Sequence, residues 1–284
     1  MARMALRPAL RAYAHAPAGA ADWTPADLTG IILWLDPSES GSNRITSGSD
    51  VTTLTDKIAA KDFTGTFPYG TYTDSATGSL GNGLEFLKTS PSVYSIRTLT
   101  FTPVGAPYND TDTGGAETDW TSWAVYYFGT GGTSVSINGL MRGRFFHTPG
   151  CFDTLTPTSV RGMGRGNWVD SNVFLPFWYT SSSPGYVSNE GRAQLLILQN
   201  KQIDGAWKLL LSQDGTDWFN GGTAPEPPAS AIPGTENVWS IILRNWDPGA
   251  DVGMGEMGFI SGAIDDSELQ TLHTYLKDKW DLHT

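Results

Sequence analysis

The sequence predicts an all-β sandwich with long loops and one short C-terminal helix. Its 33 glycines and 17 prolines divide 284 residues into many short segments. The apolar clusters between them are rich in rings, with 11 Trp, 12 Phe and 10 Tyr. Helical periodicity is convincing in a single stretch, near the C-terminus. Sandwiches run to about 250 residues as one unit, so we expect one main domain, residues 23–284, preceded by an arm, residues 1–22.

The arm, MARMALRPALRAYAHAPAGAAD, lacks a strand pattern, and Pro8 and Pro17 interrupt its alanine-rich stretches. Such a segment becomes ordered when something else holds it. A neighbouring subunit or surface can do so, or the arm can fold back on its own domain. We expect it to serve attachment and assembly, through Arg3, Arg7, Arg11 and Tyr13.

The domain should open with a short helical turn, because Thr24 can cap it, Pro25 suits the first helical position and Asp27 favours the positive end. Residues 31–35, IILWL, are continuously apolar and predict a strand buried on both faces. Further strands are expected at 84–87, 96–101, 122–128, 193–199, 207–212, 238–244 and 256–261.

Two dipeptides predict tight hairpins. Asp204-Gly205 and Asp214-Gly215 each lie between strand-like runs, and they supply the positive φ that such turns need. We therefore expect a three-stranded antiparallel meander over 193–220. The stretches 102–120 and 129–192 are rich in Gly, Ser, Thr, Asn and Pro and predict long loops, where function would be placed.

The helix begins after Asp265, which can cap it, with Glu268 three residues on. Lys277 and Lys279 would complement the C-terminal end of its dipole. The stripe that should pack on a sheet consists of Leu269, Leu272, Leu276 and Trp280.

The order of these pieces resembles the laminin-G-like, concanavalin A-like jelly-roll domains of phage virion and bacterial surface proteins. LTGIILWLDPSES, VTTLTDKIAAKDFTGTF and GNGLEF resemble the family's start, and GEMGFISGAIDDSELQTLHTYLKDKWDL resembles its close. GRAQLLILQNKQIDGAWKLLLSQDG is similar to its central hairpin. The resemblance implies two antiparallel sheets packed face to face, with glycan or protein recognition and occasional calcium. Residues 102–192 do not match, and Leu54 stands where the family usually has Trp.

Composition argues against several classes. A formal net charge of −11 repels nucleic acid. A single cysteine, Cys151, rules out an intrachain disulfide and fits folding in a reducing cytoplasm. We expect no membrane insertion, because no apolar run reaches the ~18 residues that a spanning helix needs.

No catalytic constellation is recognisable, so we expect no enzyme. A glycosidase needs two carboxylates roughly 5–10 Å apart, but Glu256 has no acidic partner two or four residues away. The string GMGEMG at 253–258 matches a dinucleotide fingerprint, but a strand follows it where a helix is required, so it predicts a bulge or close sheet packing. The histidines form neither a triad nor a metal pair.

Calcium is the one cofactor worth considering, on the loop YNDTDTGGAETD. Its acids Asp110, Asp112 and Asp119 are oxygen ligands, but their order departs from any defined calcium loop, and a solvated acidic loop is the favoured interpretation. Asp36 and Asp56 are expected to cap turns.

Aromatic side chains in or beside loops are candidates for stacking on sugars, with core filling as the competing interpretation. These candidates are Trp120, Trp168, Trp178, Tyr179, Tyr186, Trp218 and Trp246. The tryptophans assigned to packing are Trp34, Trp123, Trp207, Trp239 and Trp280.

These observations predict a non-enzymatic virion surface protein of a phage, made in the host cytoplasm: a decoration, fibre or adhesin module on capsid or tail. Its partners would be other virion proteins, bound through the arm, copies of itself, with a trimer as one form, and a cell-surface glycan. The alternative is a soluble, lectin-like carbohydrate-binding protein. A glycoside hydrolase is the third and least favoured hypothesis.

Overall fold

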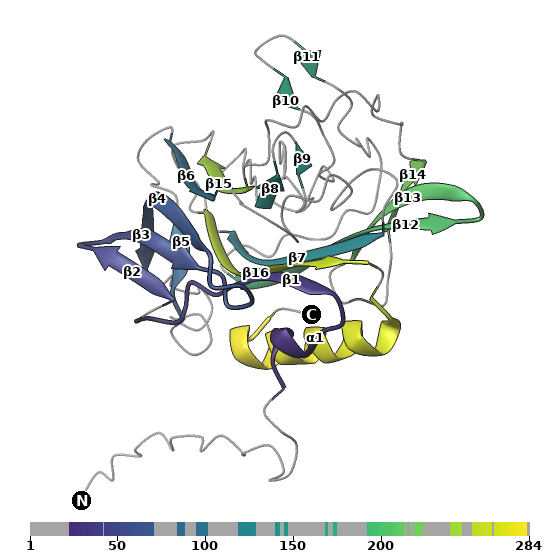
Figure 1. Ribbon diagram of the computed structural model, residues 1–284, viewed down its shortest axis with the longest axis horizontal. Coiled ribbons are helices and arrows are strands. Elements are labelled where there is room, and N and C mark those ends of the chain that lie inside the picture. Colours follow the sequence, from purple (N-terminus) through teal and green to yellow (C-terminus); the bar gives the residue numbers. More distant parts are fainter. Residues whose placement is uncertain are drawn as a thin grey trace, which may run out of the picture.

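Fourteen of the described strands form two antiparallel layers, and helix α1 follows them along the chain (Figure 1). The computed structural model describes residues 23–41, 43–70, 84–88, 95–101, 119–128, 140–142, 145–146, 168–169, 173–174, 192–212, 215, 219–223, 239–245, 252–262 and 264–282. The first layer contains β1 (Ile31–Leu35), β5 (Phe86–Lys88), β7 (Trp120–Phe128), β12 (Arg192–Ile203), β13 (Ala206–Ser212), β14 (Phe219–Thr223) and β16 (Val252–Ser261). The second contains β2 (Arg44–Ser47), β3 (Asp50–Thr55), β4 (Asp62–Gly70), β6 (Ser95–Phe101), β8 (Leu140–Arg142), β9 (Phe145–Phe146) and β15 (Trp239–Asn245).

The first layer runs in the order β14-β13-β12-β7-β16, and β1 and β5 both pair with β16. The second runs β2-β3-β4-β6-β15-β8-β9. Strand β4 belongs to both, because Thr64–Thr66 pair with β6 while Tyr69 and Gly70 pair with β5. A separate two-stranded ladder joins β10 (Trp168–Val169) and β11 (Val173–Phe174).

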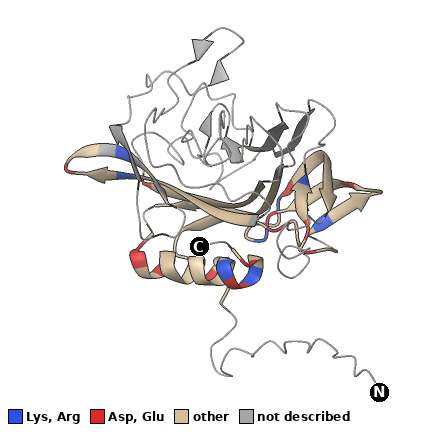
Figure 2. Cartoon of the chain, turned by 180° about the vertical axis from the view of Figure 1, so that it is seen from behind, with Lys and Arg blue, Asp and Glu red and all other residues tan. Residues whose placement is uncertain are grey.

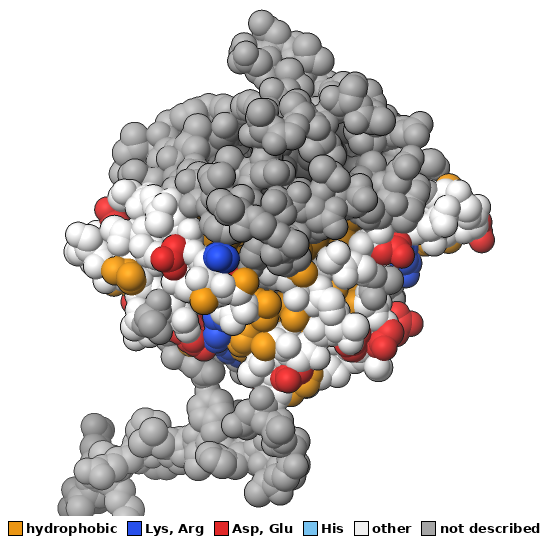
Figure 3. Space-filling view, viewed as in Figure 1, with side chains coloured by type: hydrophobic (Ala, Val, Ile, Leu, Met, Phe, Trp, Pro, Cys, Tyr) orange, Lys and Arg blue, Asp and Glu red, His pale blue; other side chains and the backbone are white. Residues whose placement is uncertain are grey.

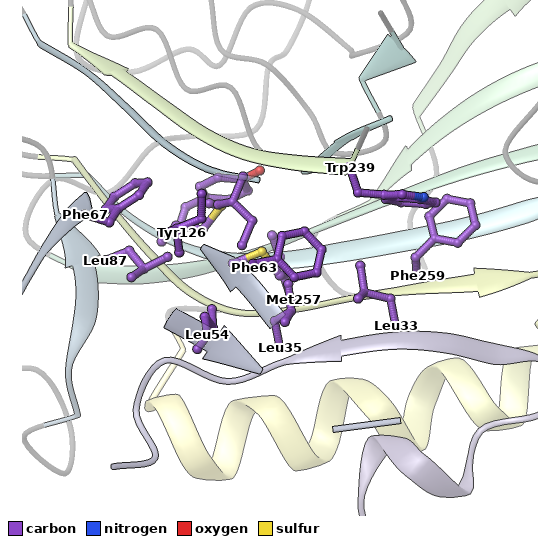
Figure 4. Close-up of a cluster of buried hydrophobic side chains, with 14 of the residues drawn as sticks. Leu33, Leu35, Leu54, Phe63, Phe67, Leu87, Tyr126, Trp239, Met257 and Phe259 are labelled. Carbon is purple, nitrogen blue, oxygen red and sulfur yellow. The ribbon is translucent and has the colours of Figure 1, made fainter. Parts of the chain in front are cut away.

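Aromatic and aliphatic side chains fill the space between the layers (Figure 4). Leu33, Met257 and Phe259 point into it from the first layer, and Phe63 and Trp239 from the second. Trp239 meets Phe259 edge to face, with ring centroids 5.3 Å apart. This shared core confirms the predicted all-β sandwich.

Helix α1 (Asp266–Trp280) covers the outer face of the first layer (Figure 1). Strand alternation supplies both faces: Ala124 and Tyr126 of β7 point to the inter-sheet core, and Trp123, Val125 and Tyr127 point to the helix. The predicted stripe is buried, with Leu269, Leu272, Leu276 and Trp280 all at most 2% exposed. Full burial of one such side chain stabilises by about 1.5–3 kcal/mol.

The ends of the helix follow its charge pattern, with acidic side chains at one end and basic ones at the other (Figure 2). Asp265 caps the start, since its Oδ1 accepts a hydrogen bond of 2.8 Å from the backbone N–H of Glu268. The Glu268 side chain does not complete a capping box. Its Oε1 accepts from the backbone N–H of Thr29 at 2.9 Å, which ties the helix to the turn η1 (Pro25–Asp27). No helix among the described residues is both long and apolar enough to cross a membrane.

Every strand predicted from the sequence is present, with small shifts at the ends. Strand β12 turns into β13 at Asp204 and Gly205, whose φ values are 53° and 77°, as the hairpin requires. β14 then pairs with β13, so the meander is confirmed. Strands β2, β3 and β4 are additional to the prediction. So are the short strands β8 to β11, which lie within the stretch 129–192 that was predicted to form loops.

The glycines of 253–258 behave as the sequence indicated. The pairing of β16 with β7 shifts register between Met254 and Met257, which is a bulge. A Cβ on Gly255 would lie 2.8 Å from the Trp280 ring, and one on Gly258 would lie 2.0 Å from the Trp123 ring. Both glycines therefore allow a tryptophan to lie against the strand.

Candidate functional site: a buried charged cluster

Asp36 follows β1 directly and is completely buried. Its Oδ1 accepts two hydrogen bonds from Ser38, one from the backbone N–H at 3.0 Å and one from the hydroxyl at 2.6 Å. The predicted turn-capping role is confirmed. The second oxygen, Oδ2, points to the helix, where it contacts Nζ of Lys279.

Glu256 is also completely buried, and strand alternation explains where it points. Met257 and Phe259 face the inter-sheet core, so Glu256 faces the helix, as Ile260 does. Two indole N–H groups hold its carboxylate: Trp34 donates to Oε1 at 2.7 Å and Trp280 donates to Oε2 at 3.1 Å.

Lys279 comes from the last turn of α1 and joins the two acids. Its ammonium donates to Oε2 of Glu256 at 2.7 Å and to the Tyr275 hydroxyl at 3.3 Å, besides contacting Asp36. The Lys279 side chain is 20% exposed, and both carboxylates are at 0%. Lys279 lies in the last turn, as predicted, and there it also pairs with two buried acids.

Burial and charge shift the protonation of this cluster. Loss of solvent raises the pKa of Glu256 to about 7, the charge of Asp36 adds to the rise, and Lys279 opposes it. Burial alone would lower the pKa of Lys279, but the charges of Glu256 and Asp36 raise it above its ordinary value. The pKa of Tyr275 is raised by its burial and by the charge of Glu256.

The loop that follows β3 contacts Trp34, one of the two indoles that donate to Glu256. Asp56 is fully buried and accepts from the backbone N–H groups of Trp34, Ile58 and Ala59 at 2.8, 3.1 and 2.9 Å, which confirms its turn-capping role. The Lys57 ammonium lies 3.7 Å from the centroid of the Trp34 ring. Basic and apolar side chains adjoin on the described part of the face in Figure 3.

One glycan candidate is wrong. Trp120 is expected in or beside a loop, but it lies in β7, is 1% exposed and stacks on Phe259 with centroids 5.7 Å apart, so core filling is the correct interpretation. The strand starts two residues earlier than predicted, which turns this ring into the inter-sheet core. Trp34, Trp123, Trp239 and Trp280 are buried as expected.

The remaining candidates fall outside what the structure describes. Trp168 lies in β10, but its side chain is outside the described set. The other residues outside it are Trp178, Tyr179, Tyr186, Trp218, Trp246, the Trp207 side chain, Arg3, Arg7, Arg11, Tyr13, Asp110, Asp112 and Cys151.

Within the described residues, no group of three or more metal-ligating side chains occurs. Asp119 is described, and its Oδ1 is buried without a hydrogen-bond partner. Asp36 and Glu256 converge, but both are shut away from solvent and share one lysine. They do not have the solvent access that a glycosidase pair requires.

No protein-family profile matches the chain, and no curated protein matches it. Among solved structures it is similar to a mutant of the Trypanosoma rangeli sialidase, with 12% identity, a TM-score of 0.48, and coverage of 90% of this chain and 34% of that one. The binding domain of Paraclostridial Mosquitocidal Protein 1 is 9% identical, with a TM-score of 0.46 and coverage of 88% of this chain and 53% of that one. The receptor-binding domain of botulinum neurotoxin type G is 10% identical, with a TM-score of 0.46 and coverage of 87% of this chain and 51% of that one.

The chain thus spans about a third to a half of the length of these three proteins. They are an enzyme and two binding domains, so the matches as a set favour no single activity. The assignment as an antiparallel β-sandwich with one C-terminal helix rests on the chain's own strands and layers.

Proposed function

We propose that this chain is a non-enzymatic binding module of a phage virion, attached through residues 1–22 and recognising a glycan through its loops. The observation that carries this proposal is where the arm joins the domain. Trp23 packs edge to face on Tyr275 of α1, with centroids 5.6 Å apart. Residue 23, where the described chain begins, therefore lies at the helix side of the sandwich.

An arm that leaves the domain from this position would keep attachment and recognition on opposite sides of the molecule. Anchoring at the helix side would turn α1 toward the particle, because the tether at Trp23 lies on it. The layer of β2, β3, β4, β6 and β15 lies across the inter-sheet core from the helix and would face outward. The long segment 147–191, which carries four of the aromatic candidates, follows β9 at the end of that layer.

Recognition is tested with a glycan array probed by the full-length chain and by Trp168→Ala and Trp178→Ala. We expect a specific hit that either substitution weakens by at least tenfold, since a ring stacked on a sugar supplies the apolar contact. The matched control is Trp120→Phe, a change in the core that leaves the glycan signal intact. The absence of a hit over a wide panel, with folded protein, contradicts the glycan part of the proposal.

Attachment is tested by comparing the full chain with a chain that starts at residue 23. Full-length protein should associate with capsid or tail components, and the shortened chain should remain free in size-exclusion chromatography with light scattering. Electron microscopy of the particle then identifies what Arg3 to Tyr13 contact. A monomeric full-length chain whose arm resists protease and binds no particle component argues against the virion role.

The soluble lectin alternative makes the opposite prediction about the arm. Removal of residues 1–22 would then leave both glycan affinity and oligomeric state unchanged. The virion module instead loses its particle partner on that removal and keeps its glycan affinity. The two hypotheses thus differ in whether removal of residues 1–22 abolishes binding to the particle.

A further inference from the structure

The cluster between the first layer and the helix contains two acids and one base. Two fully buried carboxylates, Asp36 and Glu256, share the single ammonium of Lys279. Trp34, Tyr275 and Trp280 surround them with rings. Charges are expensive to keep in such surroundings unless every one is paired, and here two acids share one base.

We propose that Lys279 and Asp36 form an intramolecular amide bond, with Glu256 transferring the protons. The bond would join the end of β1 to the last turn of α1, two points 243 residues apart. This chemistry is independent of the proposed glycan and virion roles.

The reacting groups, the Lys279 ammonium and the Asp36 carboxylate, are in direct contact. Nζ of Lys279 contacts Oδ2 of Asp36, so the carboxyl carbon lies one covalent bond beyond the contacted atom. The other oxygen, Oδ1, accepts from the N–H and the hydroxyl of Ser38 at 3.0 and 2.6 Å. These two donors would stabilise negative charge on Oδ1 when nitrogen adds to the carbon, as the donors of an oxyanion hole do.

Glu256 is placed to carry the protons. Its Oε2 is 2.7 Å from the nitrogen, and the indoles of Trp34 and Trp280 fix its orientation. Lys279 first passes a proton to Glu256 and becomes a neutral amine. Its nitrogen then bonds to the Asp36 carbon and loses a second proton. Both protons finish on Oδ2, which leaves as water when the carbon–oxygen bond breaks.

The step balances without another reactant. An ammonium and a carboxylate become an amide and one water molecule, Glu256 returns to its starting state, and nothing is oxidised or reduced. In the product a neutral amide replaces two charged groups in a site with little solvent, and Glu256 keeps its hydrogen bonds from Trp34 and Trp280. The raised pKa of Lys279 opposes the first proton transfer, so the reaction is expected to be slower than folding.

A second lysine provides the matched control. Lys57 also donates to a carboxylate, Oε1 of Glu39, at 2.6 Å. That acid is 43% exposed, so water can hydrate it. We expect no bond there.

Intact-mass spectrometry of the full, folded chain is the decisive experiment. The expected mass is lower than the sequence mass by one water molecule, and peptide mapping should recover residues 36 and 279 in one linked pair. Lys279→Arg should show the full sequence mass, Glu256→Gln should lose water at least tenfold more slowly, and Lys57→Arg should behave as the unsubstituted chain does.

The result that overturns the proposal comes from the unsubstituted protein and does not depend on how the variants fold. A folded chain that keeps its full sequence mass after prolonged incubation at neutral pH forms no amide. A water lost at some other position, with peptides 36 and 279 recovered separately, overturns it equally. A gel in denaturant supplies a second measurement, because a chain closed between residues 36 and 279 migrates differently from the open Lys279→Arg chain.

Discussion

Gly258 shows how far one side chain can control the packing of this sheet. The six-membered ring of Trp123 lies over the Gly258 backbone, where a methyl group would be only 2.0 Å from the ring. Trp123 itself is completely buried under the helix. Glycine is thus required here for close approach rather than for a special backbone angle.

We expect Gly258→Ala to lower the free energy of unfolding by about 1–3 kcal/mol or more, because the core is already filled and the Trp123 ring would have to move. Chemical denaturation measures the loss. Combining it with Trp123→Leu, which shortens the clashing side chain, should recover part of it. If the two losses simply add, the clash is not the cause.

Asp265 gives a prediction about pH. The hydrogen bond from the Glu268 N–H, followed by that from Ser267, holds the pKa of Asp265 below its ordinary value of 3.8. A lowered pKa means that the carboxylate stabilises the fold above pH 3.8 and that this contribution disappears as the pH falls through the lowered value. Asp265→Ala should therefore be less stable than the parent at pH 7, with the difference shrinking below pH 3.8.

Thermal unfolding of both chains between pH 7 and pH 3 checks this. Asp266→Ala removes a neighbouring acid without removing the cap, so it should give a smaller difference at pH 7. A gap between Asp265→Ala and the parent that stays constant through the acid range would contradict the assignment of the cap.

The charged cluster could not be found from sequence spacing. Asp36, Glu256 and Lys279 are separated by at least 23 residues, and only pairing of the strands brings them together. Glu256 shows why: it shares the helix-facing side of β16 with Gly258 and Ile260, and only the folded chain places Lys279 over that side. The glycines at 253–258 signalled an irregularity but could not say which side chain it redirects.

At the scale of the element, helix α1 was predictable because its pattern is complete. Capping residue, apolar spacing and charged ends all agree for 266–280, and the structure follows them. Strands β3 and β4 show the opposite case. The buried residues of β3 are three apart, Val51 and Leu54, because its pairing shifts register between Val51 and Thr53. Gly65 and Pro68 within β4 are typical of turns rather than strands.

Leu272 tests how much the helix contributes. It is completely buried against the first layer, so Leu272→Ala should lower the free energy of unfolding by about 2–5 kcal/mol. Thr271→Ala, one residue away on the exposed side, should change it by about 0.5 kcal/mol or less. Equal effects in denaturant titrations would show that the stripe does not hold the helix.

At the scale of the whole molecule, we predict that a chain beginning at residue 23 keeps the parent's stability. The described contacts at this end start with Trp23 on Tyr275 and continue with Asp27, whose carboxylate accepts from the Thr24 N–H at 2.8 Å. Thermal melts of the two chains should agree within about 0.5 kcal/mol. A large loss would place part of residues 1–22 inside the sandwich and move the domain boundary.

The pairing of β1 with β16 also dictates when this protein can fold during its synthesis. Leu33 is opposite Phe259 and Leu35 opposite Met257, so β1 lacks its β16 partner until more than 220 further residues have been synthesised. Until then its apolar residues are exposed, and such segments are prone to aggregation. Expression of this chain should accordingly depend on chaperones that hold nascent polypeptides, and a ribosome that stalls before residue 252 should release an insoluble product.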